Sequence, residues 1–369
     1  MSDGRTDKRR VMVVFVAWLL GWGIAQIGSA PSASAQPVGG RVSATATLSV
    51  LGGTVQHVTN GSTQAQPARD GMDLAIGDRV LTGPKSTAVI TFLDGSTVTV
   101  QPDSDVQVKK ADITPKKSTI SVKINLGVVW ARVVRLADPK SSLSLESNTA
   151  TATVHDGLIG GEMSPDHFMC WTMAGPVTVT DPQGQVLMVL LPGEKTLVQP
   201  NGKNQPAPAA FSVNQSTLRV TASAGVLPLV VMDDGARVAG FVAPTIEVNH
   251  VFGSLTQANE DGTHVVQVPA GAPGPFTVVV EGVREGAFTL TLIGSFKGAK
   301  VYEQQLSGSI KKGERMKTAV TQQLDPATAA ERPTARLQGG NAAPLETHTG
   351  PLPGKVLLSP MELQAVGGM

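Results

Sequence analysis

The chain has 369 residues with 30 basic and 29 acidic side chains, a balance that predicts no polyanionic partner and sets nucleic-acid binding aside. Forty glycines and 25 prolines in a chain rich in valine and threonine predict many short strands joined by turns, and therefore an all-β fold. The single cysteine, Cys170, excludes an internal disulfide, so the fold must be held together by its apolar core.

Residues 1–35 have the composition of a secretory signal peptide. A basic segment, Met1–Arg10, precedes the uncharged apolar segment Val11–Ala30, and a pattern of small residues follows. Cleavage is expected between Ala35 and Gln36, which predicts Sec-type export and a periplasmic or secreted protein. The 20 residues of the apolar segment are also long enough to span a bilayer. The alternative is an uncleaved signal anchor that holds the protein in the inner membrane, facing the periplasm.

Residues 42–200 alternate between short apolar runs and turn residues, which predicts a first β domain. The most sharply punctuated stretch is Gly77–Val100, GDRVLTGPKSTAVITFLDGSTVTV. The Asp-Gly pair within it predicts a β-hairpin with a tight primed turn, because such a turn needs residues with positive φ. In the strand that follows, Val98 and Val100 alternate with threonines, and this pattern predicts a strand that is buried on one face.

The same stretch carries a spaced set of glycine and polar residues that resembles the FecR domain. The matching residues are Gly77, Asp78, Arg79, Thr82, Gly83, Asp94, Gly95, Ser96 and Trp130. Trp130 lies in the predicted strand LGVVWARV. The resemblance runs from Leu48 to Val198 and implies a β-sandwich or β-roll. It departs at His155-Asp156-Gly157, where the family commonly has Arg-Gly-Thr. We expect the motif residues to hold turns in place, and they also mark a candidate partner surface.

The best-known members of the FecR family span the inner membrane. They receive a signal from an outer-membrane siderophore receptor and control an extracytoplasmic-function sigma factor through a cytoplasmic domain. This chain has ten residues before its apolar segment, so it resembles exported members that lack the anti-sigma part. The resemblance implies a non-enzymatic envelope protein whose FecR-like domain binds a protein or glycan partner in a reception or scaffold role. The alternative is a membrane-anchored signal-transduction component that regulates an anti-sigma and sigma factor pathway.

The sequence shows no complete catalytic or metal-binding pattern, and we expect no enzymatic activity, cofactor or bound metal. The six histidines lack the i, i+2 or i, i+4 spacing that is typical of zinc sites. A remote alternative is a cysteine-dependent hydrolase, because His155, Asp156 and His167 lie near Cys170 in the sequence. The competing interpretation places Cys170 in a buried strand, where its thiol is inert.

The remainder of the chain predicts a second domain between two irregular segments. Residues 201–211, with their prolines and asparagines, predict a linker. Residues 212–324 contain short apolar strands separated by turns, which predicts an immunoglobulin-like β-sandwich. Residues 325–369 show little apolar periodicity and predict a disordered tail.

Overall fold

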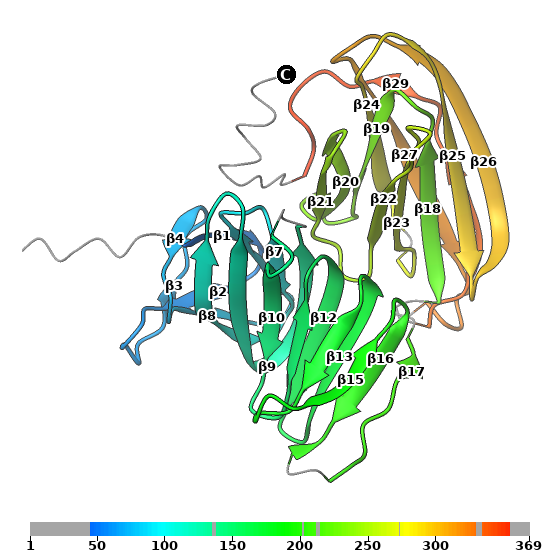
Figure 1. Ribbon diagram of the computed structural model, residues 1–369. Coiled ribbons are helices and arrows are strands. Elements are labelled where there is room, and N and C mark those ends of the chain that lie inside the picture. Colours follow the sequence, from blue (N-terminus) through cyan, green and yellow to red (C-terminus); the bar gives the residue numbers. More distant parts are fainter. Residues whose placement is uncertain are drawn as a thin grey trace, which may run out of the picture. The chain divides into compact units, whose positions relative to one another are not determined.

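Figure 1 shows a computed structural model of the chain, which describes residues 45–134, 138–200, 203–211, 215–272, 274–329 and 334–354. The predicted signal peptide, its cleavage site at Ala35 and Gln36, and residues 355–369 lie outside this part of the chain. Every regular element in the described ranges is a β-strand, which confirms the predicted all-β class. Within these ranges no helix is long and apolar enough to cross a membrane.

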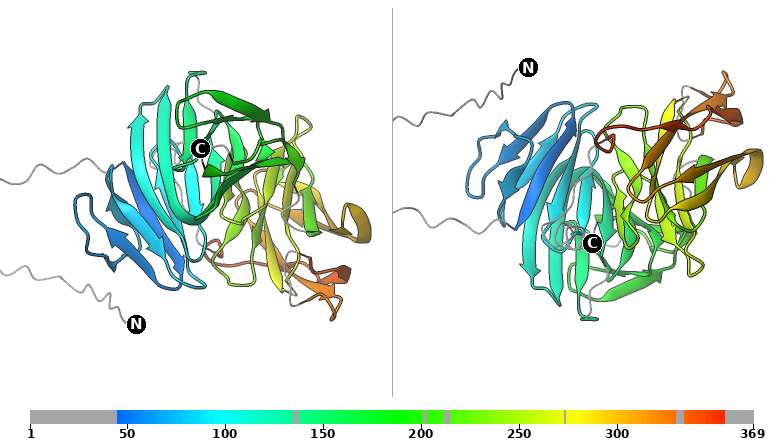
Figure 2. Two further views of the ribbon diagram at one scale, coloured as in Figure 1. Left: turned by 90° about the horizontal axis from the view of Figure 1, so that it is seen from below. Right: turned by 90° about the horizontal axis from the view of Figure 1, so that it is seen from above.

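The first domain is built from strands β1 to β17, which can be followed from blue to green in Figures 1 and 2. Their bounds are β1 Ala46–Gly52, β2 Val55–Val58, β3 Gln66–Pro67, β4 Met72–Leu74, β5 Arg79–Thr82, β6 Thr87–Phe92, β7 Thr97–Val100, β8 Asp105–Ile113, β9 Ser118–Val133, β10 Ser142–Glu146, β11 Thr151–Val154, β12 Gly157–Ser164, β13 His167–Ala174, β14 Val177–Thr180, β15 Val186–Leu190, β16 Glu194–Val198 and β17 Ala209–Ala210. The pairing of β9 with β10 is parallel.

The strands of this domain form two sheets, and the long strand β9 belongs to both. One sheet has the order β4-β1-β6-β7-β9-β12-β13-β16-β17. The other has the order β3-β2-β5-β8-β9-β10-β11-β14-β15. β9 passes from one sheet to the other at Gly127, whose φ of 87° strains any residue other than glycine. This β-sandwich agrees with the architecture that the FecR resemblance implies.

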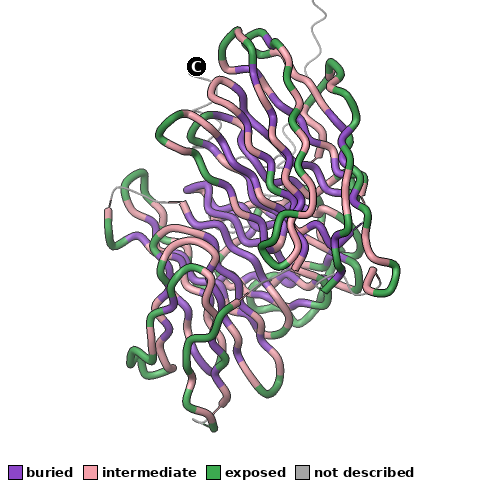
Figure 3. Tube along the Cα trace, turned by 90° about the vertical axis from the view of Figure 1, so that its right-hand side faces the viewer, coloured by how far each residue is buried: buried purple, intermediate pink, exposed green. Residues whose placement is uncertain are grey.

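Apolar side chains from both sheets fill the space between them. Leu48, Ile90 and Phe92 of the first sheet and Val122 and Leu145 of the second belong to this core, and all are fully buried. The buried stretches lie along the strands, and the exposed stretches gather at the turns (Figure 3). Burial of alternate apolar side chains is therefore what holds this cystine-free domain together.

The hairpin forms at the Asp-Gly pair, but its turn differs from the predicted one. β6 and β7 pair antiparallel, with Ala88 opposite Val100. The Gly95 amide donates to the Phe92 carbonyl at 3.0 Å, and in this loop only Gly95 has a positive φ, of 89°. A primed two-residue turn needs positive φ at both central residues, so the prediction of that turn is wrong. The observed loop is the three-residue type, in which glycine follows a type I turn.

Strand β7 is buried on both faces, so the prediction of a half-buried strand is also wrong. Thr97 and Thr99 are only 3% and 0% exposed. They lie opposite Arg132 and Trp130 of β9, on the face that contacts the second domain. The alternation of valine and threonine shows only which side chains of the strand are polar. Burial of the threonine face depends on the second domain, which is distant in the sequence.

The described part of the predicted linker, residues 203–211, packs against the first domain. Its strand β17 pairs with β16. The Asn204 side chain donates to the Leu197 carbonyl at 2.7 Å, and the Phe211 ring lies 5.0 Å from the ring of Trp171. This segment therefore extends the first sheet instead of acting as a free spacer.

The second domain is a two-sheet β-sandwich, as predicted. Its strands are β18 Ser216–Ala222, β19 Val226–Val231, β20 Val238–Ala243, β21 Ile246–Asn249, β22 Leu255–Ala258, β23 His264–Pro269, β24 Phe276–Gly282, β25 Gly286–Phe296, β26 Ala299–Ile310, β27 Arg315–Leu324, β28 Leu337–Ala342 and β29 Glu346–Thr347. One sheet has the order β22-β23-β18-β25-β26. The other has the order β21-β20-β19-β24-β27-β28, and the short strand β29 also pairs with β27. Val220, Leu290, Val278 and Phe276 are among the buried residues between the sheets.

This domain continues past residue 324, where the sequence predicts that it ends. β28 and β29 both pair with β27, and the Asp325 amide donates to the Arg336 carbonyl at 2.8 Å. The start of the predicted disordered tail at 325 is therefore corrected for the described residues up to 354. The segment LQGGNA of β28 has little apolar alternation of its own, because its place is determined by main-chain pairing and by buried Leu337.

Candidate functional site

Asp78 organises the corner that precedes β5, and it is 4% exposed. Its carboxylate accepts hydrogen bonds from the Asn60 amide at 2.8 Å and the Ala75 amide at 3.0 Å, and lies 2.9 Å from Nε2 of His57. Gly77 donates its amide to a carbonyl of β8 at 2.7 Å. The carboxylate thus ties Asn60 and Ala75 to the corner before β5, which is a structural role.

Arg79, Thr82 and Gly83 continue this arrangement along the chain. Arg79 forms an ion pair with Asp105, and this hydrogen-bonded carboxylate raises the pKa of the guanidinium. The Thr82 hydroxyl accepts a hydrogen bond from the Ser104 amide at 3.0 Å. Gly83 donates its amide to the β1–β2 connection at 3.0 Å. These residues hold β5 against β2 and β8.

Asp94, Gly95 and Ser96 form the corner of the β6–β7 hairpin. The Asp94 carboxylate accepts from the Ser96 amide at 2.9 Å and from its hydroxyl at 3.1 Å. The Ser96 hydroxyl accepts from the Val134 amide at 3.1 Å, and the Gly95 carbonyl accepts from Nη1 of Arg132 at 3.1 Å. The hairpin corner is therefore connected directly to the end of β9.

The structure does not bring the candidate hydrolase residues together. Cys170 is fully buried in the first-domain core, and burial raises the pKa of its thiol to about 12. His155 lies 2.7 Å from the Ser141 carbonyl, whereas His167 lies 3.0 Å from the Asp166 carboxylate. In the described residues no hydrogen bond or ion pair joins Cys170 to either histidine. The same residues contain no cluster of three side chains suited to a metal ion.

Trp130 differs from the other motif residues because it contacts the second domain. The described residues belong to a single unit that begins at Val42, so both β domains lie within it. The Trp130 ring is fully buried, 5.6 Å from the ring of Phe252, and its Nε1 donates to Oδ1 of Asn249 at 3.5 Å. The ring of Trp171 also lies 5.6 Å from the ring of Phe252. An aromatic cluster thus joins the domains.

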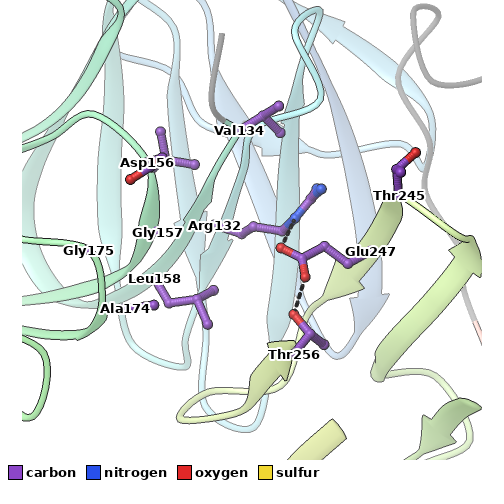
Figure 4. Close-up of a pocket in the computed structure, with 11 residues that line it drawn as sticks. Arg132, Val134, Asp156, Gly157, Leu158, Ala174, Gly175, Thr245, Glu247 and Thr256 are labelled. Carbon is purple, nitrogen blue, oxygen red and sulfur yellow. Dashed lines mark hydrogen bonds and ion pairs between the residues drawn. The ribbon is translucent and has the colours of Figure 1, made fainter. Parts of the chain in front are cut away.

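A cleft of about 450 Å³ lies beside this cluster (Figure 4). Arg132 of β9 enters it and donates Nε–H to Oε1 of Glu247 on β21 at 3.2 Å. The Glu247 carboxylate also accepts a hydrogen bond from the Thr256 hydroxyl of β22. Asp156 lines the same cleft, so this residue of the candidate hydrolase set lies away from the buried thiol. Because the guanidinium is already paired with a carboxylate, the cleft is suited to holding the domains together.

A second candidate surface lies on β15 and the segment after it. Five of the seven large apolar side chains exposed in the described residues lie between 186 and 197, and they are named here the apolar edge: Val186, Leu187, Val189, Leu191 and Leu197. β15 pairs with β14 on one side, and no further strand of the described residues pairs with its other side. Met188 and Leu190 face the core, which leaves the opposite face of the strand apolar and exposed.

Two other edge strands of the described residues carry features that discourage pairing. β3 contains Pro67, and β26 carries the exposed ion pair of Lys300 with Glu303. The stretch from Val186 to Leu191 has neither a charge nor a proline, although a bulge at its start interrupts the pairing with β14. An unprotected apolar edge is a known template for pairing with another chain. Sequence reasoning missed it, although the run VLMVLL was its signal.

Comparison with known proteins finds a family match within the first domain. Residues 78–178 match the family model described as FecR protein. The curated proteins that were compared contain no match to this chain. Two solved structures of a candidate anti-sigma factor from Parabacteroides distasonis are similar over 37% of this chain and 61% of theirs, with identities of 17% and 16% and a TM-score of 0.32 in each case.

The chain spans less than two thirds of the length of these structures. The family match includes every motif residue named above except Gly77, which lies one position before it. The resemblance that the motif residues indicate is thereby confirmed, and this chain carries a FecR-family domain over residues 78–178.

Proposed function

We propose that this protein is a non-enzymatic, exported envelope protein whose FecR domain binds a partner protein in a reception or scaffold role. The observation that carries the proposal is the apolar edge, the group of exposed side chains from Val186 to Leu197. Exposed apolar side chains beside an unpaired strand favour a partner that removes them from water and adds main-chain hydrogen bonds. The FecR match supports a role related to signal reception.

The chemistry of the apolar edge favours a protein over a glycan at this site. Its residues offer methyl and methylene groups and main-chain donors, but no side-chain carboxylate, amide or hydroxyl between Val186 and Leu191. A sugar presents hydroxyl groups that need such polar partners when they lose water. An extended peptide can instead pair its backbone with β15 and pack its apolar side chains on Val189 and Leu191.

Capture of partners by matched variants tests this proposal. The chain from Gln36 to Met369 would be immobilised and exposed to solubilised envelope from its own organism, and bound proteins identified by mass spectrometry. We expect the double variant Leu187→Lys and Val189→Lys to lose the partner that the unmodified chain retains. The control is Ile76→Lys with Leu126→Lys, which places the same charges on the two other exposed apolar residues. Equal capture by both variants would refute a role for the edge.

The runner-up function is a membrane-anchored signal-transduction component that acts on an anti-sigma factor. The FecR match and the uncharged segment Val11–Ala30 favour it. Cell fractionation with N-terminal sequencing separates the two functions. A soluble product that begins at Gln36 supports the exported form, whereas a full-length chain in the inner membrane supports the anchored one.

A further inference from the structure

The second domain has a groove on the outer face of its β22-β23-β18-β25-β26 sheet, away from the contacts with the FecR domain. The groove has a volume of about 750 Å³. The polar side chains that line it include Thr217 and Arg219 of β18, Gln267 of β23, Ser295 of β25, Lys297 in the β25–β26 turn and Lys300 of β26. Because they come from four adjacent strands and one turn, they form a continuous polar surface across the sheet.

This surface carries a local excess of positive charge that the balanced composition of the whole chain conceals. Arg219, Lys297 and Lys300 are exposed. Lys300 lies 2.7 Å from Glu303, but no ion pair with a described carboxylate is formed by Arg219 or Lys297. The prediction that the chain has no polyanionic partner rests on a total of 30 basic and 29 acidic groups, and such a total does not report their distribution.

Two further acidic side chains lie in a turn at the other end of the sheet. The β22–β23 turn contains exposed Glu260 and Asp261 and adjoins the end of β18 at Ala222, because Ala222 pairs with His264. The groove instead lies at the opposite end of β18, where Thr217 is located. Glu303 of β26 lies in the same row as Arg219, opposite Ile293, and pairs with Lys300. Arg219 and Lys297 form no ion pair with a described carboxylate, and their charges attract anions.

The fold holds the cations in place. Lys297 has a φ of 49°, and its amide donates to the Gln215 carbonyl at 2.6 Å, so the tip of the β25–β26 hairpin is tied to the start of β18. The Lys297 ammonium and the Arg336 guanidinium lie 5.5 and 5.7 Å from the centre of the Phe296 ring. Such cation–π contacts orient the charges without neutralising them.

We propose that this groove binds an acidic polysaccharide, in which carboxylates meet Arg219 and Lys297 while sugar hydroxyls bond to the neighbouring side chains. Thr217 and Ser295 are directly paired across β18 and β25, and Arg219 lies opposite Gln267 across β18 and β23. The groove thus presents cations beside neutral hydroxyl and amide groups on strands about 4.8 Å apart, a combination that suits a ligand with carboxylates and hydroxyls on its sugar units.

Two other anionic partners fit the surface less well. Single-stranded nucleic acid is bound mainly by bases stacked on exposed aromatic side chains, and the residues that line the groove include none. An anionic membrane surface is bound most firmly when apolar side chains enter the lipid, and the groove offers only partly buried Ile293. The groove proposal is independent of the apolar edge on the FecR domain, so either can fail alone.

Affinity electrophoresis of the chain from Gln36 to Met369 in gels that contain polygalacturonate tests the proposal, with neutral dextran as the reference polymer. We expect binding to polygalacturonate and none to dextran. The double variant Arg219→Gln and Lys297→Asn removes two charges, and asparagine tolerates the positive φ at 297. Its affinity should fall by about tenfold or more, with a weaker dependence on salt.

The matched control is Lys109→Gln with Lys110→Gln, which removes two exposed charges from β8 of the FecR domain. This control should retain the affinity within about twofold, since a distant exposed charge is screened by salt. Thermal unfolding of both variants checks that each is folded. If the double variant is unfolded, Arg219→Gln alone provides the same comparison at an exposed side chain.

Three results would overturn the proposal. The first is failure of the unmodified chain to bind polygalacturonate, and the second is an equal loss of affinity in the Lys109 and Lys110 control. The third is tighter binding of single-stranded DNA or polyphosphate through Arg219 and Lys297, which would assign the groove to another class of polyanion.

Discussion

Arg132 of the FecR domain and Glu247 of the second domain form an ion pair, with 3.2 Å between Nε and Oε1. The Arg132 side chain is 7% exposed and also donates to the Gly95 carbonyl, while Glu247 accepts from the Thr256 hydroxyl. The pair therefore connects the hairpin corner of one domain to two strands of the other.

Replacing Glu247 by alanine should destabilise the protein, because the buried guanidinium of Arg132 loses its carboxylate partner. We expect the free energy of unfolding to fall by about 1–3 kcal/mol, less than for a fully buried pair because Glu247 is 30% exposed. Urea denaturation measures the change. Glu303→Ala, which breaks the exposed pair with Lys300, is the control and should cost about 0–1 kcal/mol. Equal losses in the two variants would argue against a special role for the Arg132 contact.

Asp78→Asn should be among the more damaging changes in the FecR motif. An amide is a weaker acceptor than a carboxylate, and its NH₂ group would face the amides of Asn60 or Ala75. We expect a loss of about 2–3 kcal/mol in the free energy of unfolding. Asp73→Asn, at an exposed position on β4, should change it by less than about 0.5 kcal/mol. Stability that is unaffected by Asp78→Asn would contradict the structural role of this carboxylate.

Gly127→Ala tests the point at which β9 changes sheets. An added Cβ would strain a residue with φ of 87° and would lie 2.6 Å from the Cα of Ser104. We expect a loss of about 3 kcal/mol or more, seen as a lower thermal unfolding midpoint. Gly61→Ala is the matched control, since Gly61 has φ of 79° with no atom within 4 Å of the added carbon. This control should lose only the free energy that the strained backbone costs, about 1–2 kcal/mol. A similar loss of stability in both variants would show that the contact with Ser104 is not the cause.

Cys170 should make the stability depend on alkaline pH. Burial raises the pKa of its thiol from 9.0 in the unfolded chain to about 12 in the folded one. The folded state therefore favours the protonated thiol. Its contribution is fully present below pH 9 and is lost as the pH rises from 9 towards about 12, since the unfolded chain then releases the proton first.

Alkylation by iodoacetamide measures this property directly. The thiol should react slowly in the folded protein at pH 8 and rapidly in urea, because the thiolate is the reactive form and burial blocks access to it. In Cys170→Ala the stability should fall less steeply between pH 9 and 10.5 than in the unmodified chain. Rapid alkylation of the folded protein near neutral pH would revive the cysteine-dependent hydrolase as a hypothesis.

Much of the local structure is predicted by short-range patterns. The alternation of short apolar runs and turn residues over residues 42–200 predicts a β domain, and every regular element in the described part of this range is a strand. The Asp-Gly pair predicts the position of the hairpin but not its turn type, which depends on the bond from Gly95 to Phe92. Cys170 in an apolar run predicts a buried thiol, and this prediction is confirmed.

Short-range patterns do not predict the C-terminal boundary of the second domain correctly. β28 contains two glycines and few apolar residues, so its sequence resembles an irregular segment. It becomes a strand because the edge of β27 offers hydrogen-bonding groups to it, with Val320 opposite Ala342. Pairing with a preformed edge outweighs a weak intrinsic preference for the strand conformation.

The sequence by itself determined the all-β class, the position of the β6–β7 hairpin and the FecR match of residues 78–178, because each of these depends on residues that are close together in the chain. Only the tertiary structure decided that Trp130 and Arg132 contact a second domain more than a hundred residues away. It also decided that β15 is an edge and that Arg219 and Lys297 share one groove. These relationships depend on strand order and register, which arise from packing between distant segments and leave no periodic signal in any one of them.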